Sequence, residues 1–284
     1  MRLMPPHSIP IPNLLQQIPT PPEQLFHAGA PLGDLLARPR VAIVGSRMVT
    51  PYGKQITTEL AGKLAEHGIV IISGLALGVD GLAHQAALDV GGLTIAVLPT
   101  PLDTIAPPTH WRLAKRILDQ GGALLSEYAP GEQSYKYNFV NRNRLVSGLA
   151  DVLLITEAAT KSGSLHTAEF ALQQGREVMA VPGNITSRTS AGTNNLIKQG
   201  ATPVTSCIDV LHALGLESNQ TNQKVRGRNE NEQTVLDLLQ KGTQDGEKLL
   251  AQSKLSVSVF NQILTMLEIT GKIRPLGANQ WSIY

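Results

Sequence analysis

The chain has 284 residues, of which 42% are apolar and 16% charged, so it is long enough for one large α/β domain and a small second domain. A formal net charge of +2 excludes any inference about partners from the total charge. The single Cys207 excludes an intramolecular disulfide, and no apolar run approaches the roughly 18 residues that span a bilayer. We therefore expect a cytoplasmic protein that does not enter the membrane.

The N-terminal segment is rich in proline. Seven prolines fall within residues 1–22, and no apolar segment of the signal-peptide type accompanies them. We expect residues 1–23 to form a disordered arm. Residues 24–40 follow as a lead-in, whose leucines and Phe26 can pack on a neighbouring element.

Apolar runs then alternate with helical patterns. The runs predicted as strands are 41–44, 69–72, 93–98, 123–126, 151–155, 177–181 and 201–204. Helical patterns between them cover 51–68, 79–89, 110–119 and 165–174. This alternation predicts a doubly wound α/β domain with an extended Rossmann-like parallel sheet over residues 24–215.

The last part of the chain has a different pattern. Residues 216–229 are polar and aperiodic, which is typical of a linker. Helical patterns at 231–241, 246–252 and 256–268 precede a predicted hairpin at 273–284, so residues 230–284 are predicted to form a small winged-helix domain. Its third helix has no Lys or Arg, whereas a reader of duplex DNA normally contacts several phosphates from that helix. We expect a protein-contact or accessory role for this domain.

Three small polar turns follow predicted strands. They are Gly45-Ser46-Arg47, Ser73-Gly74 and Ser162-Gly163-Ser164, and the carboxyl ends of parallel strands place all three at one edge of the sheet. A helix that begins at such a turn offers unpaired N–H groups to an anion. The turns lack the further glycines of a dinucleotide-binding fingerprint, and Gly53-Lys54 lies inside a helical pattern, so neither a hydride-transfer enzyme nor a Walker-type ATPase is indicated.

A cluster of basic and aromatic residues precedes the fifth predicted strand. Cations hold phosphates and aromatic rings stack on bases, so this combination is typical of single-stranded nucleic-acid binding. The cluster consists of Lys136, Phe139, Asn141, Arg142, Asn143 and Arg144, in a loop that also contains Tyr135 and Tyr137.

These segments together resemble the DNA-processing protein A (DprA, also called Smf) family. The resemblance rests on VAIVGSR, SGLALGVDGLAH, LSEYAPG, FVNRNRLVSGLADVLLITEA, KSGSLHTAEFAL and GREVMAVPG, which stand in the family's order across about residues 25–215. It implies an extended Rossmann domain that binds single-stranded DNA, dimerises and loads a RecA-type recombinase during natural transformation. It also implies displacement of single-strand-binding protein.

Carried onto this chain, the resemblance implies one phosphate-and-base pocket. Arg47 and Lys136 would contact phosphates, and Phe139 would stack on a base. The remaining residues would line, brace or close the pocket: Gly45, Ser46, Ser73, Gly74, Asn141, Arg142, Asn143, Arg144, Ser162, Gly163 and Ser164. No catalytic residue, cofactor or metal is implied.

An enzyme remains the alternative. The lysine-decarboxylase-like nucleotide phosphoribohydrolases share the Rossmann architecture and a Gly/Thr/Glu motif at a helix start. Gly163, Thr167 and Glu169 imitate that motif in part, but Ser164-Leu165-His166 interrupts the required Gly-Gly-x-Gly-Thr arrangement. His84 and His166 also lie on helices near the predicted pocket, where packing or capping is the commoner role of a histidine.

Overall fold

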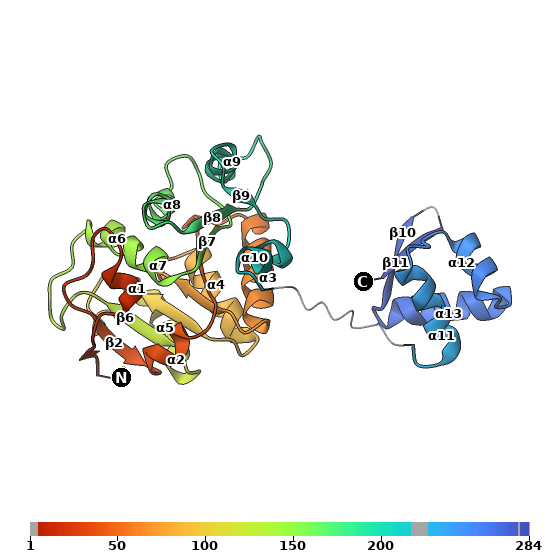
Figure 1. The fold of residues 1–284 in the computed structure, drawn as a ribbon, viewed down its shortest axis with the longest axis horizontal. Coiled ribbons are helices and arrows are strands. Elements are labelled where there is room, and N and C mark those ends of the chain that lie inside the picture. The colour runs from red at the N-terminus through yellow and green to blue at the C-terminus, as the bar shows by residue number, and fades with distance from the viewer. Residues whose placement is uncertain (1–4, 217–226, 278, 284) are drawn as a thin grey trace. The chain divides into compact units, whose positions relative to one another are not determined.

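Nine strands of the described residues form one sheet in the larger of two units (Figure 1). The computed structural model describes residues 5–216, 227–277 and 279–283, and the units are Met1–Glu217 and Ser218–Tyr284. Most of the predicted linker, 216–229, lies outside the described residues. No helix in the described parts of the chain is long and apolar enough to cross a membrane.

The sheet is parallel apart from the two strands at its N-terminal edge. Its order is β1-β2-β6-β5-β4-β3-β7-β8-β9, and β1 and β2 run antiparallel to their neighbours. The strands are β1 (His7–Ser8), β2 (Phe26–Gly29), β3 (Arg40–Val44), β4 (Val70–Ser73), β5 (Thr94–Val97), β6 (Ala123–Ser126), β7 (Val152–Ile155), β8 (Glu177–Ala180) and β9 (Thr202–Pro203). The predicted extended Rossmann-like sheet is therefore confirmed.

Helices cover both faces of the sheet because successive strand residues point to opposite sides. Ala42 and Val44 face a core that includes Leu145 and Leu149 of α7, whereas Val41 and Ile43 face α3 and α4. The helices of this unit are α1 (Asn13–Gln16), α2 (Leu32–Leu36), α3 (Pro51–Glu66), α4 (Val79–Asp89), η1 (Pro108–His110), α5 (Trp111–Asp119), α6 (Asn138–Asn141), α7 (Asn143–Leu149), α8 (Ser164–Gln173), α9 (Ala191–Lys198) and α10 (Cys207–Ala213).

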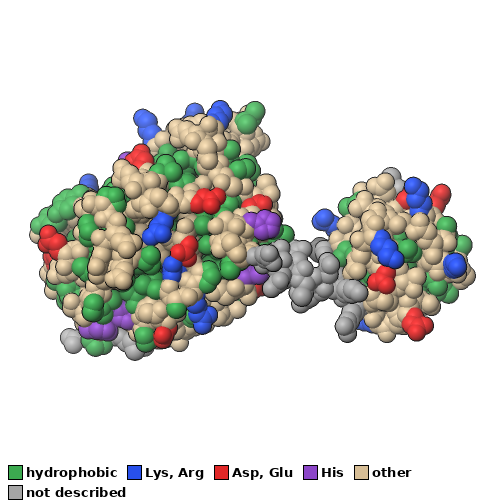
Figure 2. All heavy atoms as spheres, in the orientation of Figure 1, with side chains coloured by type: hydrophobic (Ala, Val, Ile, Leu, Met, Phe, Trp, Pro, Cys, Tyr) green, Lys and Arg blue, Asp and Glu red, His purple; other side chains and the backbone are tan. Residues whose placement is uncertain are grey.

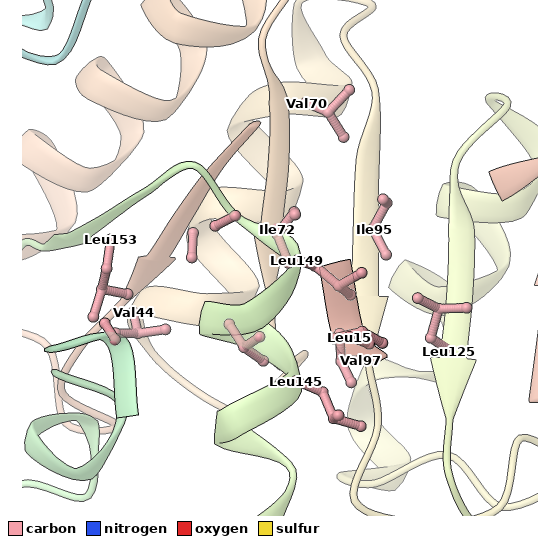
Figure 3. Packing of buried hydrophobic residues seen from close by; sticks show 14 of the residues in the cluster. Leu15, Val44, Val70, Ile72, Ile95, Val97, Leu125, Leu145, Leu149 and Leu153 are labelled. Atoms are coloured by element: carbon pink, nitrogen blue, oxygen red, sulfur yellow. The ribbon is translucent and has the colours of Figure 1, made fainter. Parts of the chain in front are cut away.

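The prediction of a disordered arm over residues 1–23 is wrong for the described part of that segment. Leu15 of α1 is fully buried and Ile18 nearly so, and both belong to the core that contains Leu145 and Leu149 (Figure 3). A Cβ added to Gly148 of α7 would lie 3.0 Å from each of these two side chains. The prolines shape the path of the segment, but the apolar residues between them have a surface to bury, and that burial orders the chain.

The smaller unit has its own core. Val235, Leu236, Phe260, Leu267 and Ile273 are buried together in it. Its elements are α11 (Glu230–Gln240), α12 (Gly246–Ser253), α13 (Val257–Ile269), β10 (Ile273–Gly277) and β11 (Gln280–Ile283), with β10 antiparallel to β11. Three helices followed by a hairpin confirm the predicted winged-helix architecture.

Each helix of the smaller unit starts at a polar residue that accepts a hydrogen bond from the first turn. Asn229 accepts from the Glu232 amide at 2.9 Å, Asp245 from that of Lys248 at 3.0 Å, and Ser256 from that of Val259 at 3.5 Å. Because these caps satisfy otherwise unpaired N–H groups, the helix boundaries are set locally by the sequence.

Candidate nucleic-acid interface

The strand order changes direction between β3 and β7. The chain adds β4, β5 and β6 on one side of β3 and then returns to add β7 on the other side. The turns after β3 and β7 consequently diverge, which leaves a crevice at the carboxyl edge of the sheet where doubly wound folds bind their ligands. A pocket of about 400 Å³ lies there, lined by residues 44–48, Ala76, Asp80, Phe139, Val140, Arg142, Asn143, Ala159, 161–164 and Thr167. We call it the β3–β7 pocket.

The turn after β3 forms one wall of the β3–β7 pocket. The Ser46 amide donates to the Glu157 carbonyl at 2.7 Å, and the Ser46 carbonyl accepts from the Val79 amide at 3.1 Å. A Cβ on Gly45 would lie 2.7 Å from that Glu157 oxygen and from Val79, so the turn passes closer than a side chain would allow. The exposed Arg47 is thus held on a fixed main chain at the mouth of the pocket.

Arg47 and Phe139 meet at that mouth although 92 residues separate them in the sequence. The Arg47 Cζ atom lies 5.7 Å from the centre of the Phe139 ring, within the range of a cation–π contact. Phe139 is half-buried on the short helix α6 and lines the β3–β7 pocket. A fixed cation over a ring provides both groups that a nucleotide needs, one for phosphate and one for base.

The turn after β7 forms the opposite wall. The Ser162 and Ser164 hydroxyls are hydrogen-bonded at 2.7 Å, and α8 begins at Ser164 with its first N–H groups toward this edge of the sheet. Asn143 spans the gap by donating to the Gly163 carbonyl at 3.4 Å. Lys161, which is exposed, lies on this wall and adds a second exposed cation to the pocket after Arg47.

The floor of the pocket contains two buried charged residues, Asp80 and Arg142, each held by main-chain groups. The Arg142 guanidinium donates to the main-chain carbonyls of Gly74 and Val97, and Asp80 accepts from the Gly74 amide at 3.1 Å. Burial raises the pKa of Asp80, against the opposing effect of Arg142. Burial also lowers the pKa of Arg142 to about 10, against the opposing effect of Asp80. Arg142 therefore braces the strand ends more than it offers itself to a ligand.

Gly74 makes that bracing possible. A Cβ at this position would lie 2.3 Å from the Arg142 Nη2 atom. Ser73, just before it, is fully buried and donates to the Ile43 carbonyl at 2.6 Å. The predicted Ser73-Gly74 turn consequently supports the floor from beneath, and neither residue lines the pocket.

Three further predicted residues lie elsewhere. Arg144 makes two hydrogen bonds to the Glu127 carboxylate, at 2.9 and 2.7 Å, and another to the Thr20 carbonyl at 2.9 Å. It thereby anchors the N-terminal segment. Lys136 and Asn141 are exposed on the loop and helix that lead into the site, and neither lines the pocket.

The prediction omitted three polar residues that the fold brings into the pocket: Lys161, Asp80 and Thr167. Lys161 directly precedes the serine turn, and this adjacency was a usable signal. Asp80 and Thr167 lie inside apolar helical patterns, where only the packing of α4 and α8 decides which side faces the pocket. With them, three cationic side chains and one buried acid line the site, which favours an anionic ligand.

On the face of the larger unit drawn in Figure 2, the charges do not form one continuous basic stripe. On the face drawn in Figure 2, Lys and Arg side chains are interspersed with Asp and Glu, and several basic groups gather at the upper edge, in the region of α8 and α9. Among the described residues no group of three or more His, Cys, Asp or Glu side chains is placed to hold a metal ion.

Two family models match the chain. The model for DNA recombination-mediator protein A matches residues 2–215, and the model for the DprA winged helix domain matches residues 219–279. The two matches fall on the two units of the structure.

Curated relatives are 40% to 50% identical to this chain over 59% to 72% of its length. Protein Smf of Escherichia coli K12 is 50% identical over 175 residues, which are 62% of this chain and 47% of that protein. DNA processing protein DprA of Streptococcus pneumoniae R6 is 45% identical over 197 residues, or 69% of this chain and 68% of that protein. The chain spans about half the length of the first of these relatives.

Solved structures agree with the sequence matches. A structure described as giving insights into the single-stranded DNA binding mode of DNA processing protein A from Helicobacter pylori is 36% identical, with a TM-score of 0.68. It covers 75% of this chain and 98% of that chain. The structure of DprA from Streptococcus pneumoniae is 41% identical, also with a TM-score of 0.68, over 74% and 75% of the two chains.

Proposed function

The chain belongs to the DNA recombination-mediator protein A family, and on that premise we propose that it binds single-stranded DNA in the β3–β7 pocket. The observation that carries the proposal is the contact between Arg47 and Phe139 at the mouth of the pocket. A duplex hides the faces of its bases, whereas an unpaired base can leave its neighbours and stack on a protein ring. The arrangement therefore favours single strands over duplexes.

Each wall of the pocket has a distinct role in this proposal. Arg47 and Lys161 bind phosphate oxygens, and Phe139 stacks on one base. The serine turn at Ser162–Ser164, at the start of α8, completes the phosphate site. Lys136, exposed three residues before Phe139, contacts the strand outside the pocket.

The wider role follows from the family. We include in the proposal that the protein loads a RecA-type recombinase onto the bound strand, displaces single-strand-binding protein, acts as a homodimer and serves natural transformation in the cytoplasm. Its support is the description of the matching family as recombination mediators and the names of the relatives as DNA processing proteins. We propose that none of these steps is an enzymatic reaction of this chain.

The arrangement at α8 supports a binder over a phosphoribohydrolase. Thr167 lines the pocket, but Glu169 is exposed and its carboxylate lies 3.2 Å from the Nδ1 atom of His166. A hydrolase of that class needs its acid beside the nucleotide, and here it points to solvent.

A binding titration tests the proposal. Fluorescence anisotropy should give tighter binding to a labelled single strand than to the matching duplex. With about three or four phosphate contacts, a plot of log affinity against log salt should have a slope of about −2 to −3. Arg47→Ala should weaken binding about 30-fold, or about 2 kcal/mol, equally for all sequences, because it removes a charge-assisted contact to phosphate.

Arg38→Ala is the matched control, since Arg38 is exposed on the same unit and lines neither this pocket nor another described one. Equal affinity for single strands and duplexes, or an affinity independent of salt, would contradict the proposal. Release of free base from AMP-type nucleotides by the wild-type chain, absent from Arg47→Ala, would favour the hydrolase instead.

A further inference from the structure

A second hollow lies on the other side of the turn after β3. It has a volume of about 550 Å³ and is enclosed by the start of α3, by α4 and by the segment η1–α5. We call it the α3–α5 groove. The function proposed above makes no use of it.

The groove and the β3–β7 pocket share one thin wall of main chain. Met48 lines the pocket, and Val49, next in the chain, lines the groove. On α4, Asp80 lines the pocket and its neighbour Gly81 lines the groove. Gly78 closes the wall between them, because a Cβ there would lie only 2.2 Å from the Ser46 carbonyl. Arg47 lies on this wall, so a DNA strand whose phosphate is bound by Arg47 can continue into either hollow.

The charge of the groove is of one sign. Lys54, Arg112, Arg116 and His110 line it, and none of its lining residues is an Asp or Glu. Arg116 pairs with Asp89 at 2.7 Å. Lys54 and Arg112 are exposed and form no ion pair with any described residue, so two full positive charges face the groove without a protein partner.

The groove also lacks the second element of the β3–β7 pocket. No Phe, Tyr or Trp lines it, and the one aromatic side chain in its lining, His110, is half-buried and hydrogen-bonded to the Leu75 carbonyl at 2.8 Å, so the groove offers no exposed ring on which a base can stack. Cations without rings bind the phosphate backbone and are indifferent to the bases. The groove therefore fits a phosphodiester chain and offers no means of selecting a base.

We propose that the α3–α5 groove is a second subsite for single-stranded DNA, in which Lys54 and Arg112 bind the backbone of nucleotides that continue past the one held at Arg47 and Phe139. This inference rests on the proposed function, because it extends the same bound strand. It assigns the base contact to the β3–β7 pocket and a purely electrostatic contact to the groove.

The two subsites predict different dependence on the length of the strand. An oligothymidylate of about 4 nucleotides fills the first subsite, whereas one of about 16 nucleotides reaches both, within the range of site sizes known for single-strand binders. In the full chain, Lys54→Ala with Arg112→Ala should weaken binding of the long strand about tenfold. The slope of log affinity against log salt should become less negative by about 1.4, since each phosphate contact contributes about 0.7. Binding of the short strand should stay within about twofold.

Control variants distinguish a loss of positive charge from a loss of folded structure as the cause of weaker binding. Lys54→Arg with Arg112→Lys keeps both charges and should retain long-strand binding, and Arg38→Ala should leave both lengths unaffected. Both substituted side chains are exposed, so the thermal unfolding midpoint should not change.

The outcomes also separate this inference from the function on which it rests. If the wild-type chain binds both strands and the double alanine variant binds the long strand equally well, the second subsite is overturned while the proposed function stands. An equal loss for both lengths would overturn it as well, because it would place Lys54 and Arg112 at the first subsite. If the wild-type chain binds neither strand, the proposed function fails and the inference with it.

Discussion

The carboxyl edge of the sheet and the third helix of the winged-helix unit are the two places where this architecture is expected to meet nucleic acid. At the sheet edge, Arg47 and Lys161 surround a pocket that also has a ring. Helix α13 contains no Lys or Arg and instead exposes Val257 and Ile269, with 61% and 73% of their surface accessible. The difference teaches that a fold supplies positions, whereas the side chains at those positions decide whether a nucleic acid binds there.

The comparison assumes that each unit folds around its own core, and Leu15→Ala tests this most strongly. The substitution should lower the free energy of unfolding of the larger unit by about 3 kcal/mol, because it leaves a cavity beneath α7. Differential scanning calorimetry should show the transition of that unit at a lower temperature and the transition of the smaller unit unchanged. Gln17→Ala, at an exposed neighbouring position, serves as the control. A loss of less than about 0.5 kcal/mol would mean that the N-terminal segment is not part of the core after all.

The next largest expected difference between the two units is in how acid affects their stability. His84 is fully buried in the larger unit, where burial lowers its pKa to about 3, and the smaller unit contains no histidine from 227 to 284. Between pH 6.5, which is the ordinary pKa of a histidine, and about pH 3, which is the pKa of His84 in the folded chain, His84 takes up a proton only when the chain unfolds. The stability of the larger unit should therefore fall by about 1.4 kcal/mol per pH unit, or about 2 kcal/mol by about pH 5.

The measurement is the free energy of unfolding against pH. His84→Gln should flatten the pH dependence of the larger unit by about one proton, whereas His166→Gln, on an exposed side chain, should not. The transition of the smaller unit should stay constant over this range. An unchanged slope in His84→Gln would show that other groups cause the acid sensitivity.

Removal of the Phe139 ring at the sheet edge should have a smaller effect, measured as a loss of affinity for single strands. Phe139→Ala should weaken single-strand binding about tenfold, or about 1.4 kcal/mol, because one base loses its stacking partner. The salt slope should not change, since no charge is removed. Phe139→Trp, which keeps a ring, should retain most of the affinity. If Phe139→Ala instead changed the salt slope as Arg47→Ala does, the two residues would not have the separate roles assigned here.

Removal of residues 227–284 should have the smallest effect. Single-strand affinity should change by less than about threefold, or about 0.7 kcal/mol, because the cations and the ring all belong to the larger unit. The isolated winged-helix unit should not retard duplex DNA in a gel. Retardation of a duplex by that unit alone would break the comparison, since it would show that α13 binds DNA without basic residues.

Much of this architecture was predictable from the sequence for a local reason. Strands that are buried on both faces are continuous apolar runs, and their helices begin and end at capping residues and glycines, so the strands from β3 to β9 and the helices α3, α4, α5 and α8 could be predicted, whereas α9 was missed. The three caps of the winged-helix unit, Asn229, Asp245 and Ser256, are equally local. The N-terminal segment was mispredicted because its prolines are visible in the sequence, whereas the surface that buries Leu15 is supplied by α7, more than a hundred residues away.

The candidate site divides in the same way. The sequence alone determined which turns follow which strands, and therefore that Arg47 and the serine turn belong near one edge of the sheet, whereas Phe139 was assigned to that site by the family resemblance. Only the tertiary structure decided which side of each helix faces the pocket: it placed Lys161 and Asp80 in the lining, directed Arg144 to Glu127, and assigned Arg142 to main-chain carbonyls. The physical reason is that strand order and helix packing join residues far apart in the chain, and no local pattern records which partner each side chain will meet.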